Sequence, residues 1–142
     1  MNESIKYTRK KIRPSDIPAT VSAKWSVTVL DEGFTPFPKR VMRAMHEIFG
    51  GRPEGIDELS VILAVADYKR LNLQRLPSIQ YLAWTSGLSV ESYRAHLEEL
   101  VKRQLVKRRG SEADLDISLA PFEQMVERLT PDDGFESSVH EF

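Results

Sequence analysis

The fold is decided by residues 77–119, which read PSIQYLAWTSGLSVESYRAHLEELVKRQLVKRRGSEADLDISL. Ser78 follows a proline and precedes an apolar run with helical spacing, so its hydroxyl is suited to cap the amide groups of a new helix. Gly87 ends that run where a positive φ angle is needed, which glycine adopts without steric cost. Ser89 is placed to cap a second helix. The pattern predicts two helices joined by a short turn, which makes them cross steeply.

The second predicted helix has one apolar face. Tyr93, Leu97 and Leu100 recur at helical spacing and therefore lie on the same side of the helix. We expect this side to pack against the apolar residues of the first helix and the turn, which are Leu82, Ala83 and Leu88.

A β-hairpin is predicted after the second helix. Residues 105–109 have the composition of a strand, residues 110–114 that of a turn, and residues 115–119 alternate between apolar and polar as a half-buried strand does. Two helices followed by a hairpin predict a winged helix-turn-helix, which is mainly α with a small β-hairpin. Proteins also use this fold to contact other proteins, so the fold alone does not define a function.

Two more helices are expected upstream. One begins at Pro38, since proline suits a first helical turn, and ends before Gly50. Its predicted buried face consists of Val41, Met42, Met45, Ile48 and Phe49. The other spans residues 56–71 and is apolar nearly all round, which is typical of a central helix covered on several sides.

The remaining segments complete the predicted organisation. Residues 1–23 are expected to form a flexible basic arm, and residues 24–129 the winged-helix domain, beginning with a short strand at residues 25–30. A helix opens at Pro121 with an apolar stripe of Phe122, Met125, Val126 and Leu129. This stripe either returns to its own core or pairs with a second copy of the chain. Residues 130–142 are expected to be a disordered acidic tail.

Composition excludes several classes of protein. The 142 residues carry a formal net charge of −1 and contain no cysteine, which excludes disulfide frameworks and zinc–thiolate sites. The polar, basic amino terminus does not read as a secretory signal, and no run approaches the ~20 apolar residues of a membrane span. We therefore expect a cytoplasmic protein that does not enter a membrane.

The charge is distributed unevenly along the chain. Residues 1–13 hold five basic side chains and one acidic one, and residues 94–109 hold six basic and two acidic ones. Residues 131–142 hold four acidic side chains and no lysine or arginine. Two basic zones and an acidic tail are thus concealed in the small net charge.

These features together resemble the amino-terminal winged-helix domain of DnaD-like and phage replication-initiator proteins, and of related bacterial and plasmid regulators. The resemblance covers residues 34–119 and rests on Phe34-Thr35-Pro36-Phe37-Pro38, the helix with Met42 and Met45, Pro77-Ser78 followed by Leu82-Ala83, Gly87-Leu88-Ser89, and Leu97 with Leu100. It implies DNA binding or, in DnaD-like proteins, self-association. The chain departs from that pattern at Gln104, where glycine is usual, and at Glu91, where many relatives have a basic residue.

With its apolar face inward, the second helix leaves its other residues for a DNA groove. Arg94 is suited to donate two hydrogen bonds to guanine, Ser92 to contact a phosphate or a base, and Glu91 to accept from cytosine. Basic side chains after residue 101 would hold phosphates. The predicted DNA-binding residues are Ser89, Glu91, Ser92, Arg94, Ala95, His96, Lys102, Lys107, Arg108 and Arg109. The alternatives are a solvated helix face and an ordinary charged hairpin.

Trp84 is expected to be partly exposed, because its neighbours Leu82 and Ala83 face the core. Exposed tryptophan often marks a binding surface, and packing against the amino-terminal strand or arm is the alternative. The predicted partner or dimer contacts are Trp25, Trp84, Phe122, Met125 and Leu129.

The sequence gives catalysis little support. His46, His96 and His140 are far apart, and no phosphate-binding loop, zinc motif or nucleophile elbow is present. We therefore expect no enzyme, no cofactor and no metal. The predicted function is double-stranded DNA binding, as a homodimer, in transcriptional regulation or in the initiation of plasmid or phage replication. The alternative is a protein-interaction or self-assembly module of a DNA-processing complex.

Overall fold

The computed structural model describes residues 13–19, 26–30, 37–70 and 74–129. Contacts divide the chain into two compact units, of which the first ends at Pro36 and the second begins at Phe37. The predicted start of the winged-helix domain at residue 24 stays a prediction. The predicted basic arm lies mostly outside the described residues, and the predicted acidic tail lies wholly outside them.

The first unit contains two short elements, η1 (Pro14–Asp16) and α2 (Val27–Leu30). The predicted strand at residues 25–30 is therefore wrong, since the amide of Leu30 donates a helical hydrogen bond of 3.1 Å to the carbonyl of Ser26. β-branched residues favour a strand only where a neighbouring strand is there to pair with them. Trp25, a predicted partner contact, lies outside the described residues.

The second unit opens with α3 (Lys39–Phe49), which begins after Pro38 and ends at Gly50 with φ +63°, as predicted. The buried residues of α3 are Val41, Ala44, Ile48 and Phe49. Met42 was predicted to be buried but is 59% exposed. It follows Val41 directly and is therefore turned about 100° away from the buried stripe.

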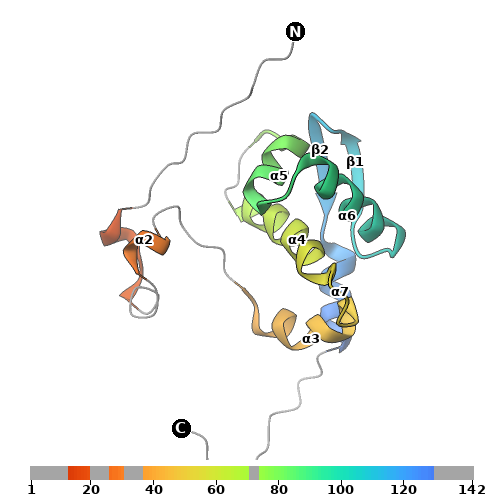
Figure 1. Cartoon of the computed structure of the whole chain (residues 1–142), viewed down its shortest axis with the longest axis horizontal. Coiled ribbons are helices and arrows are strands. Elements are labelled where there is room, and N and C mark those ends of the chain that lie inside the picture. The colour runs from red at the N-terminus through yellow and green to blue at the C-terminus, as the bar shows by residue number, and fades with distance from the viewer. Residues whose placement is uncertain (1–12, 20–25, 31–36, 71–73, 130–142) are drawn as a thin grey trace, which may run out of the picture. The chain divides into compact units, whose positions relative to one another are not determined.

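α4 (Gly55–Arg70) is the central helix, as its apolar middle predicts. It contacts both α5 (Ile79–Ser86) and α6 (Val90–Lys102), and α5 and α6 contact each other. The three helices form the body of this unit, with the hairpin beside them (Figure 1).

The serine caps and the glycine turn are confirmed. The side chain of Ser78 accepts a 3.1 Å hydrogen bond from the amide of Tyr81, and the side chain of Ser89 accepts one of 3.1 Å from the amide of Ser92. Gly87 has φ +78°. The predicted inward face is confirmed too, because Tyr93, Leu97 and Leu100 are fully buried.

The end of α6 uses Gln104 where glycine is usual. Gln104 has φ +60°, and the amide of Leu105 donates 2.9 Å to the carbonyl of Leu100, which closes the last turn of the helix. A left-handed conformation costs about 1–2 kcal/mol at a residue other than glycine. The departure from the expected glycine therefore adds strain but leaves the helix end in its ordinary geometry.

The hairpin consists of β1 (Lys107–Ser111) and β2 (Asp114–Ser118), paired antiparallel with Lys107 opposite Ser118. Its turn is shorter than predicted and contains only residues 112 and 113, so the predicted first strand at residues 105–109 starts two residues too early. Gly110 lies within β1 at φ +84°, and a β-carbon there would come within 2.3 Å of the carbonyl oxygen of Asp114.

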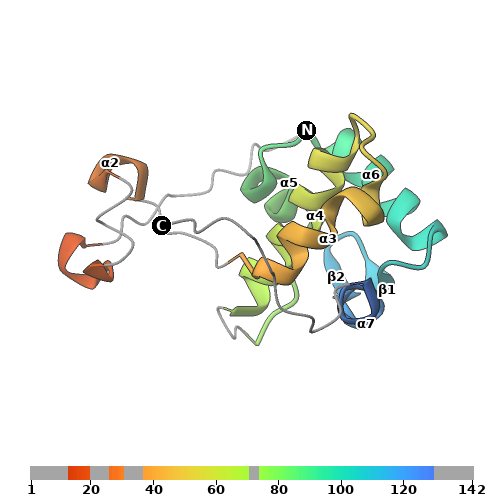
Figure 2. The same cartoon turned by 90° about the horizontal axis from the view of Figure 1, so that it is seen from below.

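α7 (Ala120–Leu129) follows the hairpin and contacts α3 (Figure 2). Phe122 and Val126 are buried in the core of this unit, and Met125 and Leu129 pack partly buried against it. The apolar stripe of α7 thus returns to its own core in the single chain.

The fold is therefore mainly α with a small antiparallel β-hairpin, which is the predicted fold class. None of the helices in the described ranges combines the length and the apolar character needed to cross a membrane.

Candidate functional site

The hairpin has a core-facing side and an outer side. Leu115 and Ile117 of β2 are buried, and Arg108 lies opposite Ile117, so the stem of Arg108 belongs to the core-facing side and is half-buried. Lys107 and Arg109 alternate with Arg108 and lie exposed on the outer side. Two of the three predicted hairpin cations therefore point outward together.

An open groove of about 930 Å³ runs past this cationic strand. Lys107, Arg108 and Arg109 supply its basic side, and its other polar lining residues are Gln104, Ser118, Gln124 and Asp116. Asp116, the one acid among the described lining residues, lies 3.3 Å from Nη2 of Arg109. Val101, Val106 and Pro121 complete the lining, so the groove is part polar and part apolar, with an excess of basic side chains that attracts anions.

The exposed stripe of α6 has a different charge. Its exposed residues are Glu91, Ala95, Glu98 and Lys102, with two acids to one base. The predicted groove-reading residues Glu91 and Ala95 are thus exposed, Ser92 is half-exposed, and Ser89 is exposed while it caps the helix. Lys102 is exposed at the carboxyl end of α6, just before the segment that lines the groove.

Arg94 does not point freely outward as predicted. Its Nε and Nη2 donate hydrogen bonds of 2.7 and 2.8 Å to the two carboxylate oxygens of Glu112, in the turn of the hairpin. This hydrogen-bonded pair raises the pKa of Arg94 and lowers the pKa of Glu112. The charge of Arg108 lowers the pKa of Glu112 further.

The backbone also fixes the tip of the hairpin. The carbonyl of Glu112 accepts a 2.7 Å hydrogen bond from the amide of Ile79, at the start of α5. The amide of Leu115 donates 2.8 Å to the carbonyl of Pro77. The segment before α5 therefore lies along β2, and the tip is held against the body of the unit.

His96 turns toward α4. Its Nε2 lies 3.5 Å from Oδ2 of Asp57, in the first turn of α4, and its side chain is largely buried. The expected outward orientation of His96 is therefore not observed. Among the described residues, no three histidine, aspartate or glutamate side chains gather as metal ligands would.

Sequence reasoning missed Glu58, which is 1% exposed. Its two carboxylate oxygens each lie 2.7 Å from an arginine nitrogen, one in Arg52 and one in Arg103. Those arginines also donate to the carbonyls of Phe49 and Ile48, so the network joins the ends of α3 and α6 to the start of α4. Helical spacing could have predicted its burial, because position 58 lies on the same face of α4 as the buried residues at 61, 62 and 65.

Trp84 is 39% exposed, which confirms its predicted partial exposure. Its ring centroid lies 6.0 Å from that of Tyr81, whose ring meets Tyr68 edge-on at 5.7 Å. The aromatic side chains thus continue from α4 across α5. The partner contact predicted for Trp84 stays a prediction.

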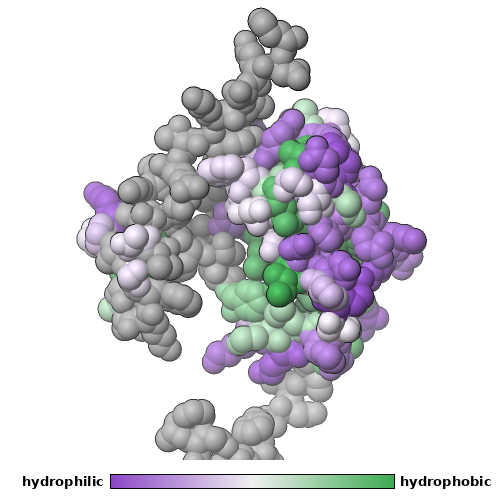
Figure 3. All heavy atoms as spheres, viewed as in Figure 1, coloured by the Kyte–Doolittle hydropathy of each residue, from purple (hydrophilic) through white to green (hydrophobic). Residues whose placement is uncertain are grey.

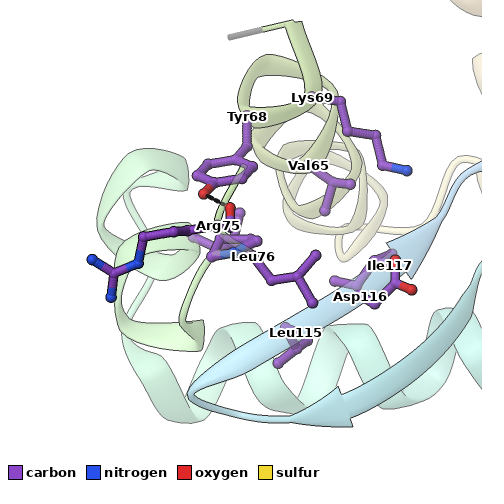
Figure 4. Close-up of a pocket in the computed structure, with 10 residues that line it drawn as sticks. Val65, Tyr68, Lys69, Arg75, Leu76, Leu115, Asp116 and Ile117 are labelled. Atoms are coloured by element: carbon purple, nitrogen blue, oxygen red, sulfur yellow. Dashed lines mark hydrogen bonds between the residues drawn. The ribbon is translucent and has the colours of Figure 1, made fainter. Parts of the chain in front are cut away.

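A separate pocket lies between α4, the segment before α5 and β2 (Figure 4). Val65, Leu76, Leu115 and Ile117 line it, and the hydroxyl of Tyr68 donates to the carbonyl of Arg75 at its edge. Its volume of about 190 Å³ is smaller than most small-molecule sites, which begin near 300 Å³. We assign it no ligand.

The surface of the second unit is divided by hydropathy. Figure 3 shows hydrophilic residues over the side that carries α6 and the hairpin, while apolar residues reach the surface over α3 and α4. Met42 of α3 and Ile56 of α4 are the most exposed large apolar side chains in the described ranges.

Comparison of the chain with protein-family models, with curated proteins and with solved structures gave no match. The functional conclusions below therefore rest on the residues and their geometry.

Proposed function

We propose that this protein is a winged helix that binds double-stranded DNA through the outer side of its hairpin and the carboxyl end of α6. The order of α4, α5, α6 and hairpin supports the winged-helix assignment, as does the segment before α5 that bonds to β2. The observation that carries the DNA proposal is the basic strand of Lys107, Arg108 and Arg109 beside an open groove.

Phosphate contacts explain why this side is favoured. Lysine and arginine side chains that neutralise phosphates release counterions from the DNA. Each neutralised phosphate makes the slope of log affinity against log salt concentration more negative by about 0.9. Three side chains are exposed and can therefore contact phosphates: Lys102, Lys107 and Arg109. We therefore expect a salt slope of about −2 to −4.

The exposed stripe of α6 favours backbone contacts over base reading. Glu91 and Glu98 on this stripe repel phosphates, and only Lys102 at its carboxyl end attracts them. Binding dominated by phosphates positions a protein on a duplex but carries little sequence information. We therefore propose weak sequence preference, in a role in transcriptional regulation or replication initiation.

A fluorescence-anisotropy titration of a labelled duplex at several salt concentrations tests the proposal. Changing Lys107→Glu together with Arg109→Glu is expected to weaken binding at least about tenfold, since each lost phosphate contact is replaced by repulsion. The charge-matched control is Lys39→Glu together with Arg43→Glu, two exposed residues of α3 outside the groove. Equal losses in both variants, or no binding of the unaltered protein at low salt, contradict the proposal.

Self-association is a second candidate function, supported by the exposure of Met42 and Ile56 at 59% and 71%. Single exposed apolar side chains are ordinary on a protein surface, and only a contiguous patch of them is typical of a contact surface. Self-association replaces DNA binding as the proposal if duplex stays unbound at low salt while sedimentation equilibrium shows a mass that rises with protein concentration. A homodimer that also binds DNA gives both signals.

A further inference from the structure

Arg94 is the residue on which base reading by α6 most depends, and its hydrogen-bond donors are already engaged. Its Nε and Nη2 bond to both carboxylate oxygens of Glu112, at 2.7 and 2.8 Å. This forked geometry is the one that arginine uses for a phosphate or for the O6 and N7 atoms of guanine. Glu112 therefore presents to Arg94 the same pair of acceptors that DNA would present.

The carboxylate of Glu112 is held in position by the backbone. Its carbonyl accepts from Ile79, its turn has only two residues, and the neighbouring Leu115 bonds to Pro77. A backbone fixed in this way keeps the Glu112 side chain within reach of Arg94. The backbone bonds between the hairpin tip and the start of α5 thus place Glu112 beside Arg94.

The pair is also open to exchange. The side chains of Arg94 and Glu112 are 38% and 40% exposed, so an external anion has access to the guanidinium. Exposed ion pairs contribute little net stability, because water competes for both charges. An acceptor of the same geometry can therefore displace Glu112 at low cost.

We propose that Glu112 is an internal substitute for a DNA acceptor: it occupies Arg94 until a forked phosphate or guanine acceptor takes its place. Glu112 thereby lowers the affinity for DNA and restricts the Arg94 contact to duplexes that present such an acceptor in the right place. This inference rests on the proposed DNA binding and assigns an affinity-setting role to the hairpin turn.

A double-mutant cycle on DNA binding tests this role. Glu112→Gln keeps the shape of the side chain and removes its charge, and is expected to tighten duplex binding by up to about fivefold, because DNA no longer has to break an exposed ion pair. Arg94→Gln alone is expected to weaken duplex binding about fivefold or more, because the forked contact that Arg94 makes once DNA displaces Glu112 is lost. With Arg94→Gln already present, Glu112→Gln is expected to add less than about twofold.

The combined variant separates release of Arg94 from simple loss of repulsion. Removing any acid near DNA improves binding electrostatically, and Glu98→Gln, at an exposed acid of α6, measures that effect. Duplexes with and without G·C pairs identify the acceptor: a gain on both indicates a phosphate, and a gain confined to G·C-containing duplex indicates guanine. Thermal unfolding of each variant checks that the hairpin is intact.

The binding of Glu112→Gln, alone and with Arg94→Gln, distinguishes between the possible roles of Glu112. If Glu112→Gln gains as much in the Arg94→Gln background as alone, the effect is repulsion and the inference is wrong. If Glu112→Gln binds less tightly, the pair only positions the hairpin, and DNA binding survives without the inference. If neither the unaltered protein nor Glu112→Gln binds at low salt, the proposed function fails as well. Binding of the unaltered protein at low salt, together with a gain for Glu112→Gln that is lost in the Arg94→Gln background, supports both proposals.

Discussion

The two ends of α6 are each joined to the rest of the domain by an arginine–glutamate contact, and the two contacts differ in burial. At the carboxyl end, Arg103 reaches Glu58, which is shielded from water and is also bonded to Arg52. At the amino end, Arg94 pairs with Glu112, and both side chains are more than a third exposed to solvent. We therefore expect loss of the buried carboxylate to destabilise the fold, and we expect the exposed pair to exchange its partners more readily.

Removal of the buried carboxylate is expected to have the largest effect on stability. Glu58→Gln leaves two guanidinium groups without their shared counter-charge, and we expect a loss of about 3 kcal/mol in the free energy of unfolding. Urea denaturation of the purified protein measures it, with Glu98→Gln as an exposed control on α6. A loss below about 1 kcal/mol would mean that water reaches the site and that the two contacts are equivalent.

Substitution of Gly110 in β1 tests how much the backbone conformation at the hairpin tip contributes to stability. Gly110→Ala places a methyl group against the carbonyl of Asp114 and forces a residue with a side chain to adopt φ +84°. We expect a loss of about 2 kcal/mol, measured by the same denaturation. Gly87→Ala is the matched control, since it has a similar φ of +78° and open space around the added carbon. Equal losses would show that the close contact in the hairpin adds nothing to the backbone strain.

Acidification is expected to have the smallest effect on stability, through the exposed pair of Arg94 and Glu112. Pairing with Arg94 lowers the pKa of Glu112, so the contribution of the pair is present above the unfolded pKa and is lost as pH falls through the folded one. We expect the difference in melting temperature between the unaltered protein and Glu112→Gln to shrink below about pH 4. At pH 2 we expect Glu112 to be protonated and its ion pair with Arg94 to be lost. A difference in melting temperature that stays constant down to pH 2 would therefore contradict this prediction.

Local signals in the sequence predicted most of the helices. Ser78 and Ser89 each cap a helix that starts where expected, and Gly87 takes the expected turn, because caps and turns depend on neighbours in the chain. Tyr93 and Leu97 face inward for the similar reason that helical spacing fixes the buried side.

Features that depend on distant parts of the chain were not predictable in the same way. The pairing of Arg94 was not predictable, because its partner Glu112 lies in the hairpin turn, 18 residues away in sequence. The strand predicted at residues 25–30 failed because strand preference depends on a neighbouring strand. Alternation placed Lys107 and Arg109 together, but only the register of the hairpin shows that Arg108 shares the side of the buried Ile117.

The bonds from Pro77 and Ile79 to the hairpin also bear on the solubility of the chain. An uncovered strand edge invites edge-to-edge aggregation with another molecule, and proteins protect such edges by covering them or by charging them. Here the segment before α5 covers the β2 edge near the tip of the hairpin. β1 carries Lys107, Arg108 and Arg109, whose mutual repulsion disfavours stacking of one hairpin on another. The basic strand thus protects the sheet against aggregation whether or not a nucleic acid is bound.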